Sequence, residues 1–538
     1  MSHSDDEPLT PETVRRDLEE LQRRYGNRVQ FNVIRAGVFE PRDEEKAPPK
    51  KEGIRKKILE FNFLPKDVKE QLDRYVIRQD DAKKALAIAI CDHYNHVRAC
   101  EENPELLERD YTKQNIILMG PTGVGKTYLV RTLARMIGVP FVRADATKFS
   151  ETGYVGGNIE DLVRDLVTQA DGDIGLASYG IIYLDEVDKI AGSKSDYGRD
   201  VSGRGVQTGL LKLLEETEID TRSPYDIQSH MRAAIEATRG EKPEAHTINT
   251  RHILFIVSGA FNGLTEIIQK RLHKSAMGFA ATLRVRDESI DYLRQVTSQD
   301  FINFGFEPEF IGRLPVHVAC HPLDDDDLFD ILKYSEGSII RQYEDAFAAY
   351  GIKTWFTDEG LRAIASIAHR ERTGARGLVT VCERTFREFK YELSSTKVSG
   401  IVIDRELVEH PDKILKKLIK NPDLHRLPIA RLQLKAFERK LVERWGLPFK
   451  FTAAGADFVA RRAVENDSTP EEVWEKSFEG LQAGLELLGK HNNRSVIYIN
   501  PDVFEDPAGA LDKWIQQSCR SKKKAGSKRR GKGDVGAS

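Results

Sequence analysis

The sequence predicts an α/β protein: a doubly wound parallel sheet of the nucleotide-binding type, followed by a small α+β domain that we expect to be duplicated. From about Ile58, apolar runs alternate with amphipathic helical patterns, as in buried parallel strands joined by helices. A phosphate-loop motif directly follows the first apolar run. Beyond Leu323 the pattern becomes mostly helical, and one stretch recurs 95 residues later.

The first residues predict a small module and a linker. Residues 1–37 hold a helical pattern followed by a short alternating, strand-like run. Residues 38–57 are charged and proline-rich, which is typical of a linker. A module this short cannot stabilise a core alone, so we expect it to dock on another part or stay mobile.

The large domain is expected at residues 58–322. Four apolar runs are interpreted as its parallel strands, at residues 115–119, 140–146, 180–186 and 252–259. The segment 127–138 between the first two carries its apolar residues on one stripe and ends at Gly138, which predicts a helix with a glycine stop.

The small domain is expected at 323–410, with a degenerate second copy at 411–519. Residues 350–370 realign with residues 445–465, and both stretches are later followed by a strand-like run. Chance similarity between two amphipathic helices is the alternative. Residues 520–538 hold eight Lys or Arg and one Asp, which indicates a disordered basic tail. This tail is either an arm for nucleic acid or an acidic partner, or a solvated end without a role.

Composition excludes several classes of protein. The 538 residues are 40% hydrophobic and 31% charged, as in ordinary globular chains. The sequence lacks an apolar run long enough for a membrane helix, and its first residues are acidic and polar, unlike a secretory signal. The five cysteines do not form a CxxC pair, so neither a zinc site nor a disulfide framework is predicted. We therefore expect a cytoplasmic protein.

The stretch "GPTGVGKT" is a complete phosphate-loop motif between a strand and a helix. Its backbone N–H groups and the helix N-terminus favour phosphate, so ATP is the expected ligand. Lys126 is expected to reach the outer phosphates, and the Thr127 hydroxyl to bind Mg²⁺. The expected binding residues here are Pro121, Thr122, Gly123, Val124, Gly125, Lys126, Thr127 and Tyr128.

Two acids end the third apolar run, in "IIYLDE". Ends of parallel strands open onto the ligand crevice, so Asp185 is expected in the Mg²⁺ shell and Glu186 as the base that polarises the attacking water. The acids of residues 322–330 are instead interpreted as the first turn of a helix, where the dipole favours them.

Other motifs are ambiguous when taken singly. Arg313 in "PEFIGRLP" and Arg376 in "TGARGL" would offset charge on a γ-phosphate only if they reach a nucleotide, and are otherwise surface arginines. Tyr154 in "GYVG" would ordinarily be interpreted as part of a glycine-rich surface turn.

Together these motifs resemble the ClpX/HslU branch of the AAA+ unfoldases, and its ClpX members in particular, over roughly residues 64–404. The resemblance implies an AAA+ large and small domain in a ring, expected to be a hexamer, with ATP and Mg²⁺ at the subunit interfaces. The residues it implicates are Val76 and Ile77 beside adenine, Ser258 as sensor 1, Glu309 before the arginine finger Arg313, and Arg376 as sensor 2.

The same resemblance gives "GYVG" a role. Tyr154 and Val155 match the axial pore loop that grips an unfolding polypeptide, and residues 199–207, with Val201 and Arg204, match the second pore loop. Met277, Gly278 and Phe279 lie where ClpX carries the loop that docks on the ClpP peptidase.

The sequence also departs from that family. It lacks the amino-terminal zinc domain, and residues 219–250 replace a basic loop at the pore mouth. Arg204 stands where ClpX has an acid, which predicts a more basic pore. In the second copy Glu471 occupies the position of Arg376, so we interpret that copy as a docking or ring-bracing module.

These observations predict an ATPase that threads polypeptides through a pore, delivers them to a ClpP-type peptidase, and is not itself a peptidase. Two alternatives stay open at this point. One is a stand-alone remodeller of protein complexes, and the other is a nucleic-acid-associated ATPase recruited by the basic tail.

Overall fold

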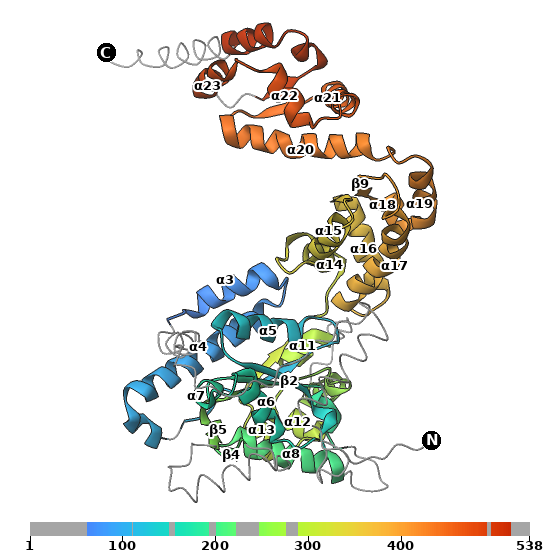
Figure 1. The fold of residues 1–538 in the computed structure, drawn as a ribbon. Coiled ribbons are helices and arrows are strands. Elements are labelled where there is room, and N and C mark those ends of the chain that lie inside the picture. The colour runs from blue at the N-terminus through green and yellow to red at the C-terminus, as the bar shows by residue number, and fades with distance from the viewer. Residues whose placement is uncertain are drawn as a thin grey trace, which may run out of the picture. The chain divides into compact units, whose positions relative to one another are not determined.

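The computed structural model describes residues 62–109, 111–149, 157–192, 201–221, 247–275, 289–491 and 496–517 (Figure 1). Several predictions fall outside these residues and have no structural counterpart here. They concern the amino-terminal module, the linker, the pore-loop residues Tyr154 and Val155, the tripeptide Met277 to Phe279, and the basic tail.

A parallel sheet organises the first part of the described chain, as predicted, and it has five strands because one further strand joins the four that were predicted. Its order is β2-β3-β6-β1-β7, and every neighbouring pair is parallel. The central strands are buried almost throughout, which is why their sequences read as unbroken apolar runs. The strands are β1 (Ile116–Met119), β2 (Phe141–Asp145), β3 (Ile181–Asp185), β6 (Leu254–Gly259) and β7 (Val316–Ala319).

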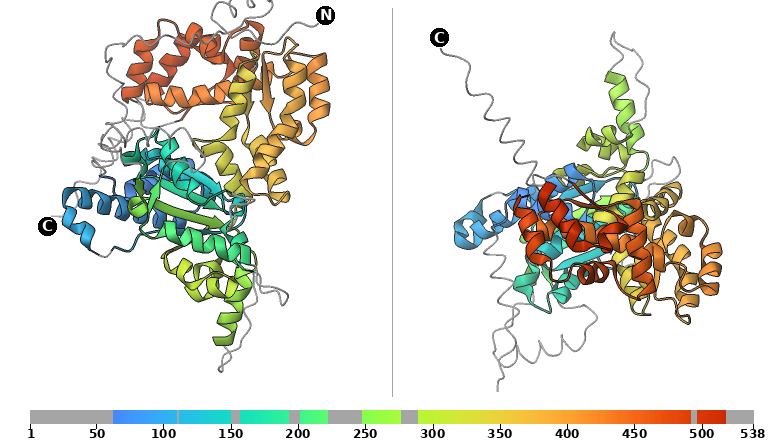
Figure 2. Two further views of the ribbon diagram at one scale, coloured as in Figure 1. Left: turned by 60° about the horizontal axis from the view of Figure 1, so that its bottom comes forward. Right: turned by 90° about the horizontal axis from the view of Figure 1, so that it is seen from above.

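Helices surround this sheet (Figure 2) and share with it one hydrophobic core that runs from Val68 to Cys320. A short antiparallel pair, β4 (Glu218–Asp220) and β5 (Thr247–Asn249), comes between β3 and β6 in the sequence. The helices are α3 (Pro65–Tyr75), α4 (Asp80–Glu102), η2 (Pro104–Glu108), α5 (Lys126–Ile137), η3 (Ala146–Lys148), α6 (Asp161–Gln169), α7 (Ile174–Ala177), η4 (Val187–Ile190), α8 (Val201–Leu214), η5 (Thr250–His252), α10 (Leu264–Ser275), α11 (Ser289–Arg294), α12 (Ser298–Phe304) and α13 (Pro308–Gly312).

A second core begins at Leu323 and ends at Leu418. The predicted boundary at residue 411 is therefore too early, because Ile414, Leu415 and Leu418 of α19 pack into this core. Its elements are α14 (Asp325–Tyr334), α15 (Ile339–Ala348), β8 (Lys353–Phe356), α16 (Asp358–Arg370), α17 (Ala375–Leu393), β9 (Gly400–Ile403), α18 (Arg405–Glu409) and α19 (Pro411–Lys420).

The acidic run at 322–330 forms a helix start, as predicted. Asp324 is the N-cap of α14 and accepts a hydrogen bond from the Asp327 N–H, while Asp327 accepts one from the Asp324 N–H. Arg78 forms ion pairs with both carboxylates. Within the described residues, clusters of His, Cys, Asp and Glu that could hold a metal ion are absent.

A third core runs from Leu434 to Leu511. Its elements are α20 (Arg426–Trp445), β10 (Phe449–Phe451), α21 (Ala453–Glu465), α22 (Pro470–Ser477), α23 (Gln482–His491), β11 (Ile497–Ile499) and η6 (Pro501–Phe504), and residues 507–517 are again helical.

The second and third cores share details beyond helix content. Helices α16 and α21 begin and end at equivalent positions of the predicted repeat, and each precedes the return strand of a two-stranded parallel sheet. Thr357 caps α16 through the Gly360 N–H, and Thr452 caps α21 through the Gly455 N–H. Such agreement in capping favours a duplication over chance similarity, and we retain the duplication as a proposal.

The two segments differ after these helices. In the second core α17 is one helix of 19 residues, whereas the third core has α22 of 8 residues and then the separate helix α23. Gly480, with φ of 78°, lies between α22 and α23, a conformation that suits glycine and interrupts a helix. The third core thus lacks a counterpart of α17, the continuous helix that begins beside Arg376 in the second core.

Helix α20 links the two segments. At its start the Nδ1 atom of His425 accepts a hydrogen bond from the Val402 N–H of β9, at 2.9 Å. The Ile429 side chain lies so close to Gly400 that a Cβ atom there would stand 2.8 Å from it. The first turns of α20 therefore pack on β9, while its later residues Leu434, Phe437 and Leu441 belong to the third core.

Candidate functional site

The phosphate loop has the backbone that its glycines allow. Gly120, Gly123 and Gly125 have φ values of 144°, 80° and 94°, which L side chains rarely adopt. Helix α5 then begins at Lys126, so the free N–H groups of its first turn open onto the loop. The motif thus forms the strand–loop–helix arrangement that binds phosphate in this class of fold.

Lys126 is held inside this loop. Its Nζ atom donates hydrogen bonds to the carbonyl oxygens of Gly120, at 2.6 Å, and Pro121, at 2.8 Å. Burial lowers the pKa of Lys126, and the charge of Arg376 acts in the same direction, while Asp185 opposes it. The loop therefore contains a buried cation whose desolvation an anionic phosphate would offset.

Asp185 accepts hydrogen bonds on both carboxylate oxygens. Oδ1 accepts from the Ser258 hydroxyl, at 2.6 Å, and from the Glu186 N–H, at 3.1 Å. Oδ2 accepts from the Thr127 hydroxyl, at 3.2 Å, and from Arg143, at 3.0 Å. Burial alone would raise the pKa of Asp185, but these donors and the charge of Arg143 outweigh it and lower the pKa.

Tyr183 joins the same network from β3. Its hydroxyl lies 2.7 Å from the Ser258 Oγ and 3.1 Å from the Thr127 Oγ1, and the side chain is fully buried. Ser258, Thr127 and Asp185 thus converge from β6, α5 and β3, which brings together three residues that sequence reasoning placed separately.

Glu186 directly follows this cluster. Its backbone adopts a left-handed conformation with φ of 57°, which is uncommon for a residue other than glycine, and its side chain is exposed. The chain turns here from β3 into η4, so the two acids of the motif point differently: Asp185 into the hydroxyl cluster and Glu186 toward solvent.

Arg376 is brought to the loop by α17. The Ala375 N–H donates to the Gly123 carbonyl at 2.9 Å. A Cβ atom on Gly123 would stand 2.0 Å from the Thr373 carbonyl oxygen, and one on Gly374 would stand 2.6 Å from the Gly123 oxygen. The start of α17 therefore contacts the phosphate loop backbone to backbone, which places Arg376 beside it.

A pocket of 530 Å³ lies at this contact, a size that suits a nucleotide. Pro121, Thr122 and Val124 of the loop line it, together with Leu323 and residues around His369.

Val76 and Ile77 lie just after α3, with Val76 buried. They are not among the lining residues of the 530 Å³ pocket. Gln79, two residues after Ile77, uses its side chain to bond both the N–H and the carbonyl of His321 at 2.7 Å, and His321 precedes the lining residue Pro322.

The remaining predicted residues form a different group. Arg313, at the end of α13, donates to Glu215 at 2.7 Å, and Arg204 of α8 forms an ion pair with Glu307. Glu309 is exposed on α13. The backbone of Val201 begins α8. Because Glu307 neutralises Arg204 locally, this arginine alone does not make the surface more basic.

The structure also adds residues that the sequence did not single out. Arg143 contacts Asp185, and Glu215 contacts Arg313, but neither lies in a recognised motif. The pairing of β2 with β3 sets Arg143 opposite Tyr183, two residues from the level of Asp185, and only the sheet order reveals this. Tyr183 was visible as the polar residue within an apolar run.

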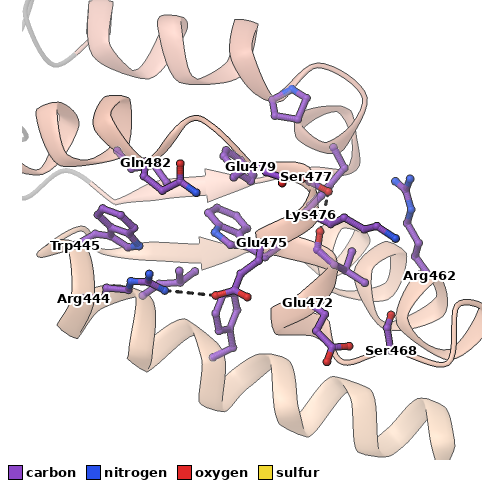
Figure 3. Close-up of a pocket in the computed structure, with 18 of the residues that line it drawn as sticks. Arg444, Trp445, Arg462, Ser468, Glu472, Glu475, Lys476, Ser477, Glu479 and Gln482 are labelled. Carbon is purple, nitrogen blue, oxygen red and sulfur yellow. Dashed lines mark hydrogen bonds and ion pairs between the residues drawn. The ribbon is translucent and has the colours of Figure 1, made fainter.

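A larger pocket, of 950 Å³, lies in the third core (Figure 3). Buried Trp474 and Phe478 are among its lining residues. Figure 3 shows the ion pair between Arg444 and Glu475, which also line it. Its lining residues include neither a phosphate loop nor a carboxylate held by hydroxyl donors, unlike the site at Lys126.

Residues 111–317 match the family model of the AAA domain of the Cdc48 subfamily. Over 347 residues the chain is 40% identical to the ATP-dependent Clp protease ATP-binding subunit ClpX of Borrelia duttonii, covering 64% of this chain and 78% of that one. It is 38% identical over 400 residues to the protein of the same name from Porphyromonas gingivalis, covering 71% and 93%.

None of the helices in the described part of the chain is long and apolar enough to cross a membrane. The parallel sheet, the loop at Lys126 and the two acids at the end of β3 agree with the AAA domain match. With relatives this similar over most of their length, the chain belongs to the ClpX family of AAA+ ATPases.

Proposed function

We propose that this chain is an ATP-driven protein unfoldase that threads polypeptides through the axial pore of a ring and delivers them to a ClpP-type peptidase. The observation that carries the proposal is the convergence of Lys126, Thr127, Asp185 and Ser258 at one loop, in a chain of the ClpX family. The ATPase activity belongs to that family, and the residue roles below are our assignments.

The residues at the loop fit ATP with Mg²⁺. The loop's backbone and the buried Lys126 suit the outer phosphates, and the hydroxyl of Thr127 with the carboxylate of Asp185 offers the oxygen ligands that Mg²⁺ prefers. When bound, Mg²⁺ supplies positive charge beside the phosphates. Glu186, which is exposed next to this pair, then orients and deprotonates the attacking water.

Two arginines complete the assignment. Arg376 stands beside the phosphate loop of its own chain. We assign it as the residue through which α17 responds to a nucleotide bound at that loop. Arg313 is assigned as the arginine that enters the nucleotide site of the neighbouring subunit in a hexameric ring. In the single chain its guanidinium bonds Glu215, so it must exchange this partner when the ring forms.

The pore contacts are assigned to two loops. Tyr154 and Val155 would grip the moving polypeptide, since an aromatic ring contacts many kinds of side chain. Val201 and Arg204 would form the second loop at the start of α8. The Arg204–Glu307 pair leaves that position less basic than its sequence predicts.

Delivery to a peptidase is assigned to Met277, Gly278 and Phe279. The relatives named above are ATP-binding subunits of a Clp protease, which favours delivery over a stand-alone remodeller. A nucleic-acid-associated ATPase recruited by the basic tail is not favoured by these relatives.

The test of the motor is Glu186→Gln. This variant should bind ATP and keep it without turnover, because the glutamine cannot accept the proton of the attacking water. Retention of labelled ATP would be measured together with phosphate release. Sustained hydrolysis by the variant would refute the assignment of Glu186.

The tests of the partner and the pore use two further variants. Complex formation with a ClpP-type peptidase under saturating ATP would be followed by mass photometry, with binding by the wild type and loss of binding in Phe279→Ala. Tyr154→Ala should keep its ATPase rate and lose unfolding of a folded reporter protein. Binding unaffected by the first change, or unfolding unaffected by the second, would refute the respective role.

A further inference from the structure

One face of α8 carries side chains that contact the elements on both sides of it. Arg204 and Gln207 are three residues apart and so lie on the same side of the helix. Both contact the residues that lead into α13, and Glu215, just beyond the helix, contacts Arg313 at the end of α13. A narrow groove of 240 Å³ runs between this face and α13.

Gln207 is the buried centre of this face, with 1% of its surface exposed. Its Nε2 atom donates to the Ile190 carbonyl at 2.8 Å, and its Oε1 atom accepts from the Glu307 N–H at 2.8 Å. One side chain therefore joins η4, which follows Glu186, to the residue before α13. Arg313 is the first residue after that helix.

The segment after Glu186 is attached on its other sides as well. The Asp188 carboxylate accepts from the N–H groups of Ala260 and Phe261, just after Ser258. The Gly192 N–H donates to the Gly305 carbonyl at 3.0 Å. A displacement of this segment would therefore reach both the hydroxyl cluster at Asp185 and the entry to α13.

The close approach of α8 to η4 also requires a glycine. A Cβ atom on Gly203 would stand 2.6 Å from the Ile190 carbonyl oxygen, the same oxygen that accepts from Gln207. The glycine lets α8 come near enough for the amide to reach. Helix α8 and η4 are thus in direct backbone contact at the level of Gln207.

We propose that Gln207 is a positioning residue for ATP hydrolysis, which ties the helix of the second pore loop to the segment after Glu186 and to the helix that carries Arg313. Contact of a polypeptide with the start of α8 would then shift Glu186 and Arg313 together. This inference rests on the proposed roles of Arg313 and of the second pore loop, and it adds the residue that couples them.

The chemistry requires an amide at this position. Ile190 offers a carbonyl and Glu307 offers an N–H, so the side chain must donate at one atom and accept at the other. Methionine has a similar length, but its thioether cannot donate to Ile190 and accepts from Glu307 only weakly. A carboxylate can accept from Glu307 but can donate to Ile190 only when it is protonated.

The experiment is a double-mutant cycle in the full-length ring with Gln207→Met and Arg313→Ala. Gln299→Met, at an exposed glutamine of the same domain, is the matched control. We expect Gln207→Met to assemble and to bind ATP with a KM within about twofold of wild type, while kcat falls about tenfold, which corresponds to about 1.4 kcal/mol of transition-state stabilisation. Stimulation of the ATPase by an unfolded polypeptide should be lost.

In the Arg313→Ala background the same change should lower kcat less than threefold, because both residues act through one path. A kcat for Gln207→Met within twofold of wild type, or an undiminished tenfold loss in the Arg313→Ala background, would overturn the inference while leaving the proposed function intact. A wild-type rate in Arg313→Ala alone would instead remove the role of Arg313 and this inference with it.

A second variant keeps the test valid if Gln207→Met does not fold. Gln207→Glu retains the shape and the acceptor for Glu307, and burial raises the pKa of the new carboxyl group. Relative to wild type its kcat should recover as the pH falls, because the protonated oxygen again donates to Ile190. A flat ratio between the two proteins from pH 8 to about pH 5.5 would count against the proposal.

Discussion

Ser258→Ala removes one hydroxyl from the centre of the Asp185 cluster, and its effect follows from the structure. The hydroxyl is fully buried and donates to Asp185 Oδ1 at 2.6 Å. A hydrogen bond to a charged group contributes about 1.5–3 kcal/mol, which is roughly 10-fold to 150-fold in rate if the interaction is needed only for turnover. Because Oδ1 keeps the Glu186 N–H at 3.1 Å, we expect the lower end, about tenfold in kcat.

The same change has a defined effect on pH dependence. The pKa of Asp185 is lowered in the folded protein, so its ionised form contributes stability at neutral pH that is lost as the pH falls through the folded-state pKa. Loss of the Ser258 donor raises that pKa toward its unfolded value and reduces this contribution. The acid limb of the ATPase profile should therefore move to higher pH.

The assay is steady-state ATP hydrolysis at saturating Mg²⁺ from pH 5 to about pH 9, with Ser298→Ala as an exposed control on α12. ATP affinity should change little, since Ser258 contacts Asp185 and Tyr183 rather than the loop. A kcat within twofold of wild type, together with an unmoved acid limb, would show that the hydroxyl does not set the state of Asp185.

Three further predictions concern stability. Gly123→Ala should lower the melting temperature of the nucleotide-free protein more than Gly125→Ala does. Both glycines have positive φ, but only at Gly123 would the new Cβ atom meet the Thr373 oxygen, at 2.0 Å. Equal losses in thermal melts would argue against the contact with α17. Thr452→Ala should cost about 1 kcal/mol of unfolding free energy, because it removes the cap of α21, and should leave the ATPase rate unchanged. Thr357→Ala is the matched change in the second core. A lower ATPase rate in Thr452→Ala would link the third core to the nucleotide. Burial lowers the pKa of His93 to about 3, so below its unfolded pKa of about 6.5 only the unfolded chain binds the extra proton, and the free energy of unfolding decreases as the pH falls. His93→Gln should flatten this dependence between pH 6.5 and about pH 4 in denaturant titrations. An unchanged slope would assign the acid sensitivity to other groups.

Much of the fold was predictable because its signals are local. The buried runs at β1, β3 and β6 are apolar on both faces, which only a covered parallel sheet requires, and Gly138 ends α5 with φ of 83° as the helix pattern predicts. The boundary near residue 411 was misplaced because α19 is amphipathic and carries no sequence mark of the core it joins.

The candidate site was predictable in part for the same reason. Lys126, Thr127 and Asp185 belong to contiguous motifs whose geometry is set by a strand and the turn after it. Arg143 reaches Asp185 from β2, and Glu215 meets Arg313 from just beyond α8. The partners of these two residues lie 42 and 98 residues away in the sequence. Such contacts depend on strand order and helix packing, which residue patterns do not encode.

The link between α20 and β9 bears on how this protein can be shortened. All four residues of β9 are buried, and the Val402 N–H of this strand donates to the Nδ1 atom of His425. A chain cut after Lys420 would present this strand as an open edge, to which the same strand of another copy could add and begin aggregation. Deletions that ask what residues 434–517 do should therefore retain the chain through Leu432, His425 included, so that an insoluble second core is not mistaken for a lost partner.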